Sequence, residues 1–147
     1  KKSQTPSFLT DEAQYNHLVQ LIRQGKLHAY RADFLGKTTL QGIGTALTQL
    51  DEQIRLLYLS NIEDYFDYTP QLEKNMNALP SPEEAVVLRT HSHKYEEDWH
   101  FSYGMQPFQM FKLWLGEDSL VNMNKANTKM RRNRLLPSEY YEMKDAP

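Results

Sequence analysis

Apolar residues recur along this chain at spacings that predict helices alternating with strands. A first helix is expected between Thr10, a suitable N-cap, and Gly25, which would end it. Its apolar side is formed by Tyr15, Leu18, Val19 and Ile22. A short strand over Leu27–Ala32 follows, and then a second helix from Thr38 or Thr39. The apolar side of that helix is formed by Leu40, Ile43, Leu47 and Leu50.

The run from Ile54 to Phe66 is the expected centre of the fold. Its first half is apolar almost without alternation, a pattern typical of a strand covered on both faces and therefore of a parallel sheet with helices on each side. Together with the strand at Leu27–Ala32 and the helix between them, it predicts a right-handed β-α-β unit. The run ends in polar residues, which places side chains at the edge where ligands bind.

The remaining elements follow in order along the chain. Pro70 suits the first position of a helix that continues through Leu79. Ala85–Thr90 is a third strand, and the polar run His91–Asp98 is a loop or an exposed extension. The aromatic stretches Trp99–Tyr103 and Gln109–Leu115 predict a β-hairpin or two final strands.

These elements predict an α/β fold, a Rossmann-like three-layer sandwich whose mainly parallel sheet has an antiparallel C-terminal hairpin or edge strand. The chain has 147 residues, enough for one ordinary core. We expect an α/β domain over residues 1–116 and a polar, partly basic tail over residues 117–147. The chain begins with Lys1 rather than methionine, so a processed form, a trimmed chain or the ordered part of something longer is expected.

Composition excludes several classes of protein. A net charge of −2 does not indicate a particular kind of binding partner. The chain has no cysteine, which excludes a disulfide, a thiolate metal site and a cysteine nucleophile. No apolar run approaches the roughly 18 residues that a membrane helix needs, so no membrane span is expected. Localisation stays open between a cytoplasmic and an exported soluble protein.

Polar side chains follow three predicted strands, and the carboxyl ends of parallel strands meet at one edge. Candidate ligand-binding residues at this edge are Asp33, Ser60, Asn61, Glu63 and Thr90. A carboxylate, a hydroxyl and an amide suit a ribose or another polar ligand. The spacing Ser60-x-x-Glu63 also fits a capping box, in which both side chains serve a helix start, so this pair has a local alternative.

Two further motifs give weaker evidence for a functional site. His91 and His93 alternate as strand neighbours do and could ligate a metal with Asp98 or His100, but solvated histidines in a charged loop explain them as well. Gly42 and Gly44 lie within the second helix, where a phosphate loop does not form. We expect these glycines to let the helix approach a neighbour closely.

The tail over residues 117–147 and the aromatic hairpin are candidate surfaces for a protein partner. Basic residues of the tail could bind an anionic surface, but acidic residues are interspersed among them, which does not favour nucleic acid. The aromatic residues fit core and edge packing better than base stacking.

Several segments, in consistent order, resemble a little-characterised bacterial family with a fold like that of S-adenosylmethionine-dependent methyltransferases. The matching segments are Phe8–Thr10, Ala32–Gly36, Ile43–Gly44, Tyr58–Tyr65, Asn75–Pro80 and Val86–Thr90. Ala32 departs from the pattern, since the family usually has glycine there. The resemblance covers roughly residues 8–90 and is to the carboxyl half of that family, which implies that residues 1–116 are the C-terminal part of a larger domain.

The resemblance implies a methyltransferase-like protein of unassigned activity. It also implies that the glycine-rich turn for the cofactor lies outside these residues, so S-adenosylmethionine or a related nucleoside would bind when the protein is complete. The alternative is a non-catalytic, possibly exported interaction protein on a Rossmann-like scaffold. The resemblance alone does not decide whether the protein is an enzyme.

Overall fold

The structure, a computed structural model, describes residues 7–95, 98–118, 121–122 and 141–143, with the backbone alone for residues 91–95, 98–102 and 141–143. The chain divides into two compact units, Lys1–Arg31 and Ala32–Pro147. Among the described residues, no helix is both long enough and apolar enough to cross a membrane.

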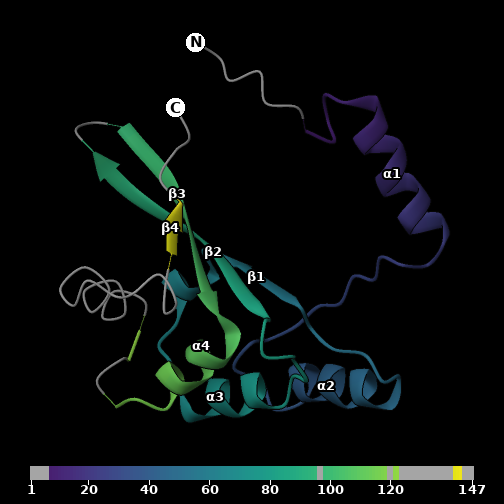
Figure 1. Cartoon of the computed structure of the whole chain (residues 1–147). Coiled ribbons are helices and arrows are strands. Elements are labelled where there is room, and N and C mark those ends of the chain that lie inside the picture. Colours follow the sequence, from purple (N-terminus) through teal and green to yellow (C-terminus); the bar gives the residue numbers. More distant parts are fainter. Residues whose placement is uncertain (1–6, 96–97, 119–120, 123–140, 144–147) are drawn as a thin grey trace. The chain divides into compact units, whose positions relative to one another are not determined.

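The first unit contains helix α1, Glu12–Arg23, which confirms the predicted helix (Figure 1). Its N-cap is Asp11, whose side chain accepts a hydrogen bond of 2.8 Å from the Gln14 backbone N–H. Thr10, the expected cap, instead accepts a hydrogen bond from the Ser7 backbone N–H. None of the residues of α1 is buried, so its apolar side is open within this unit.

The prediction of a strand at Leu27–Ala32 is wrong. These residues form neither helix nor strand, and all of them are exposed. A strand is stable only when its backbone groups pair with a neighbour, and no described strand pairs with this segment. The expected β-α-β unit from Leu27 to the Ile54 run is therefore absent from the described fold.

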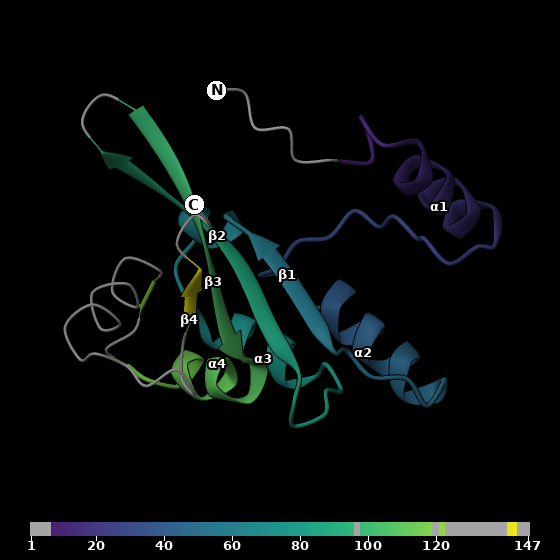
Figure 2. The same cartoon turned by 45° about the horizontal axis from the view of Figure 1, so that its top comes forward.

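The second unit is built on a mixed sheet with the strand order β1-β2-β3-β4 (Figures 1 and 2). Its strands are β1 Leu56–Ser60, β2 Val86–Tyr95, β3 Asp98–Pro107 and β4 Tyr141–Met143. Strands β1 and β2 are parallel, whereas β2 with β3 and β3 with β4 are antiparallel. The fold is thus mixed α/β, and the described sheet is not mainly parallel.

The helices of this unit gather on one face of the sheet (Figure 2). They are α2 Thr39–Gln49, α3 Pro70–Asn77 and α4 Phe108–Leu115, with the short 3₁₀ helix η1, Ile62–Tyr65, after β1. As predicted, Pro70 opens α3, and Thr69 caps it by accepting from the Leu72 backbone N–H. The core between helices and sheet includes Leu59, Leu72, Met76, Val87, Phe108 and Phe111.

Two predicted C-terminal elements differ in the structure. Residues 109–115 form α4 rather than a strand, because Phe108, Phe111 and Leu115 fall on one side of a helix and bury there. Of the two alternatives for the polar run after Thr90, the loop is wrong and the extension agrees with the structure, since β2 continues to Tyr95 and pairs with β3 back to Asp98. The aromatic residues of β3 therefore pair with β2, not with residues 109–115.

Close helix packing confirms the prediction made for one of the two glycines. A Cβ atom at Gly44 would lie 2.1 Å from the backbone oxygen of Ala78, so α2 can approach the end of α3 only because this side chain is missing. A Cβ atom at Gly42 would meet nothing within 4 Å. Gly42 therefore has no such packing role.

The two faces of the sheet differ in burial. Leu59, Val87 and Gln106 point to the helices and are buried, whereas the alternate residues Leu56 and Tyr58 are 56% and 52% exposed. The expectation that the Ile54 run is a central strand covered on both faces is therefore wrong: β1 is an edge strand of the described sheet with one face open.

Candidate functional site

The carboxyl end of β1 has an irregular backbone. Ser60 has a φ of 52°, the left-handed region that non-glycine residues seldom adopt, and the pairing of β1 with β2 shifts between Tyr58 and Ser60. Ser60 is exposed and Asn61 is half-buried. The Asn61 side chain hydrogen-bonds Asp64, whose pKa is raised by burial and by the neighbouring Glu63 carboxylate.

Glu63 is turned into the protein, where it meets a buried arginine. Arg89 Nε donates to Glu63 Oε2 over 2.6 Å, and only 2% and 3% of the two side chains are exposed. The hydroxyl of Tyr68 donates to the other carboxylate oxygen, also over 2.6 Å. Arg89 Nη1 donates to Gln106 Oε1 over 2.8 Å. These four residues form the buried polar cluster.

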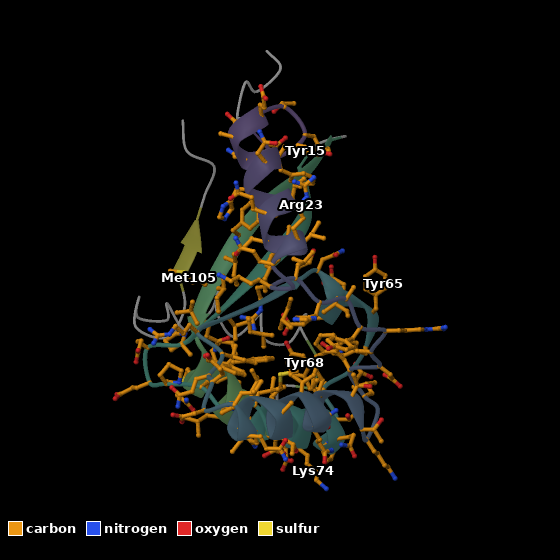
Figure 3. The ribbon with its side chains drawn as sticks, turned by 90° about the vertical axis from the view of Figure 1, so that its right-hand side faces the viewer. Tyr15, Arg23, Tyr65, Tyr68, Lys74 and Met105 are labelled. Atoms are coloured by element: carbon orange, nitrogen blue, oxygen red, sulfur yellow. The ribbon has the colours of Figure 1, made fainter. Side chains whose placement is uncertain are left out.

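The aromatic ring of Phe111 lies against the buried polar cluster. The Arg89 guanidinium carbon lies 4.8 Å from the centre of the Phe111 ring, and Phe111 meets Tyr68 edge to face. Figure 3 shows Tyr68 in the interior, whereas Tyr65 points outward. Burial and then the Glu63 carboxylate raise the pKa of the Tyr68 hydroxyl above its ordinary range, so this hydroxyl stays protonated and donates.

The capping-box alternative for Ser60 and Glu63 is wrong. Asn61, not Ser60, is the N-cap residue of η1, and it makes no side-chain cap bond. Both oxygens of Glu63 are used by Arg89 and Tyr68 instead. Both carboxylate oxygens of Glu63 are therefore occupied by contacts within the protein.

Asp33, another predicted site residue, has a local role. Its carboxylate accepts from the Leu35 backbone N–H over 2.9 Å and shapes the turn at residues 33–36. The buried Asn75 holds this turn, because its side-chain nitrogen donates to the carbonyls of Phe34 and Gly36. The Asn75 oxygen accepts from Gln41 and Gln71. Asp33 itself is exposed.

Thr90 lies on the open side of the sheet. Its hydroxyl oxygen is 2.9 Å from that of Tyr58, on the neighbouring strand. Of the five predicted ligand residues, the structure therefore leaves Ser60 and Asn61 near one strand end. The side chains of Glu63, Asp33 and Thr90 form hydrogen bonds within the protein.

The open side of the sheet carries an apolar surface, which we call the outer face. Alternation of side chains and strand register define it: Tyr58 pairs with Leu88, and Leu88 with Met105. Exposure is 44% at Tyr103 and 36% at Met105, on β3. The outer face comprises Leu56, Tyr58, Val86, Leu88, Thr90, Tyr103 and Met105.

Sequence reasoning missed both the buried polar cluster and the outer face. An arginine inside the apolar strand Val86–Thr90 signals a buried charge that needs a carboxylate, and this signal could have identified Arg89. The outer face gave no such signal, because an apolar residue that is exposed looks the same in a sequence as one that is buried.

The weaker candidates have the following positions. His91 and His93 lie in β2 and pair with Ser102 and His100 of β3, while their side chains are outside the described residues. The described side chains include no group of three or more His, Asp or Glu residues placed to hold a metal ion. Most of the tail after Asp118 is also outside the described residues, although β4 pairs with β3.

A small hollow of about 180 Å³ lies beside Tyr68. It is bordered by the first residues of α3 and by the segment that follows α4. None of the predicted ligand residues lines it. Its lining consists of Tyr68, Thr69, Pro70, Glu73, Leu115, Gly116, Glu117, Asp118 and Val121.

Comparison with known proteins places the chain in one family. No curated protein matches it. A family model described as a domain of unknown function, DUF7790, matches residues 1–141, and the chain therefore belongs to that family.

Proposed function

We propose that this chain is a non-catalytic protein-interaction domain that binds a partner protein through its outer face. One observation carries the proposal: the outer face presents apolar and aromatic side chains from three neighbouring strands, and none of its residues is charged. Large contiguous apolar patches are uncommon on the surface of monomeric proteins and mark interaction surfaces.

The energetics of burial favour such a partner. Fully burying a side chain such as Leu or Met contributes about 1.5–3 kcal/mol, and the exposed fractions of Leu56, Tyr58, Tyr103 and Met105 range from 36% to 56%. A partner that covers them gains part of this free energy from each. The partner must itself present an apolar, uncharged surface, because a charge placed against this face would lose its hydration.

Site-specific photo-crosslinking tests this proposal. A benzophenone amino acid replaces Tyr103 on the outer face, and in a matched control it replaces Tyr65, an exposed tyrosine on η1. Irradiation in the organism that encodes the protein should give one defined protein adduct from position 103 and none from position 65. The adduct should disappear when Tyr58 and Met105 are changed to aspartate.

Mass spectrometry of the adduct identifies the partner and the contacting peptide. Two results contradict the proposal: no protein adduct at position 103, or equal adducts from both positions.

A second candidate function has its own supporting observation. Ser60 combines a left-handed backbone with an exposed side chain at the end of the parallel pair β1 and β2, next to Asn61. Strained residues cluster at functional sites, and ligands of α/β proteins bind at such strand ends. This candidate is the methyltransferase-like protein, with S-adenosylmethionine or a nucleoside as ligand and with helices on the outer face completing a Rossmann-like three-layer sandwich.

Titration calorimetry, which measures ligand binding directly, tests this second candidate function. The complete protein should bind S-adenosylmethionine or adenosine, and Asn61→Ala should weaken binding by about 10-fold, as expected for the loss of one hydrogen-bonding side chain. A wild-type protein that releases no heat of binding with either compound contradicts this candidate and leaves the interaction domain unaffected.

A further inference from the structure

We propose that the partner on the outer face is a second copy of this chain, with the two outer faces packed against each other around a two-fold axis. The inference rests on the proposed function, since it identifies the partner of that same surface. In such a pairing each residue meets its own counterpart or a near neighbour across the axis.

Charge is the first argument for self-pairing. A two-fold axis brings identical surfaces together, so any charged residue near the axis would face a like charge. Leu56, Tyr58, Leu88, Tyr103 and Met105 carry no charge, and neither do the other described residues of the outer face. The described side chains of this surface therefore introduce no like-charge repulsion across the axis.

The polar atoms of the outer face give the second argument. Tyr58 and Thr90 direct their hydroxyl groups toward each other, at 2.9 Å, within one copy. One hydroxyl donates to the other, so burying the pair against an apolar surface leaves one O–H donor without a partner instead of two, and each unpaired hydroxyl costs about 1–3 kcal/mol. This pairing lowers the cost of burial against a partner with few hydrogen-bonding groups, such as another outer face.

The geometry of the sheet gives the third argument. The apolar side chains stand in register over β1, β2 and β3, so they form a broad patch rather than a groove for one helix or strand. Two twisted sheets pack face to face at a spacing of about 10 Å through such patches. The helices α3 and α4 cover the opposite face, so each copy would contribute one helical layer outside.

Charge-swapped variants test the pairing on the full chain by sedimentation equilibrium. One variant carries Tyr58→Lys and Met105→Lys, and the other carries Tyr58→Asp and Met105→Asp. The wild type should be a dimer, and each variant should have its dissociation constant raised by about 100-fold or more. Mixing the two variants should restore the dimer, because opposite charges then face each other.

The mixture also controls for folding, since restored pairing requires that both variants be folded. Leu113→Lys is the matched control: Leu113 is an exposed leucine on α4, away from the outer face, and this variant should dimerise as the wild type does. A monomeric wild type overturns the proposal, and so does pairing that both double variants retain, or a mixture that stays monomeric.

These results separate the two proposals. A monomeric wild type whose residue 103 crosslinks to one different protein overturns self-pairing and supports the interaction domain. A monomeric wild type with no adduct at position 103 contradicts both.

Discussion

Glu63 and Arg89 are both almost completely buried, so each charge depends on the other for compensation. Removing two charges from water is costly, and their attraction offsets this cost only with good geometry and further hydrogen bonds. Tyr68 and Gln106 supply such bonds. Arg89 Nη2 and Gln106 Nε2 are buried and have no hydrogen-bond partner among the described residues, so this part of the cluster is under-satisfied and sensitive to substitution.

Replacing one partner should destabilise the protein strongly. Arg89→Met leaves the Glu63 carboxylate buried without its cation, and we expect the free energy of unfolding to fall by about 3–5 kcal/mol. Urea denaturation measures this change. The double variant Glu63→Gln with Arg89→Met should recover more than half of the loss, and a double variant as unstable as the single one would show that the charge is not the cause.

Tyr68 should make stability depend on alkaline pH. Because its pKa is raised in the folded protein, the folded state keeps this proton above pH 10 or so, where the unfolded chain releases it. This contribution to stability is full below about pH 10 and is lost as the pH rises further.

Tyr68→Phe isolates this effect from the other tyrosines. At neutral pH it should cost about 1.5–3 kcal/mol, the value of a hydrogen bond to a charged group. Above about pH 10 the difference in unfolding free energy between wild type and variant should narrow. If the unfolding free energies of wild type and variant differ by the same amount from pH 7 to 11, the proposed titration is ruled out.

At the scale of elements, the contact of α2 with the end of α3 depends on one missing side chain. Gly44→Ala places a methyl group against the Ala78 backbone oxygen, where backbone cannot yield easily, and should cost about 1–3 kcal/mol. Gly42→Ala is a matched control in the same helix, with open space at its Cβ position.

The control should raise stability by roughly 0.5–1 kcal/mol, because alanine is the better helix former. Thermal unfolding compares the two variants. Equal effects at positions 42 and 44 would refute the packing role of Gly44.

Elements with clear local signals could be predicted from the sequence. Helices α1, α2 and α3 follow from apolar spacing, with Gly25 marking the end of α1 and Pro70 the start of α3, and the β2 strand follows from its apolar run. α4 was mistaken for a strand because its aromatic residues suit strands, although Phe108, Phe111 and Leu115 have helical spacing. The segment Leu27–Ala32 has strand composition without a strand to pair with, which only tertiary structure reveals.

The candidate site was predictable in position more than in role. The polar residues after β1 do lie at a strand end, with Ser60 and Asn61 accessible. The inward turn of Glu63 depends on Arg89, 26 residues later in the chain, and no local pattern encodes such a contact. Register across three strands likewise creates the outer face, whose residues are scattered in the sequence.

At the scale of the whole molecule, the second unit is asymmetric. One face of its sheet is packed with helices around a polar cluster, and the other is an apolar surface. Sheets with antiparallel strands commonly leave one face to water, but that face is then usually polar, so the apolar character of the outer face favours the proposed association.

The exposed stretch between α1 and the turn at Asp33 has a consequence for proteolysis. A protease needs an extended segment that enters its cleft, and residues 26–33 are exposed and form neither helix nor strand. Within residues 7–95, brief trypsin treatment of the folded protein should first cut after Lys26 and Arg31. N-terminal sequencing should then read Leu27 or Ala32, while the Asn75 contacts keep the adjoining turn protected from digestion.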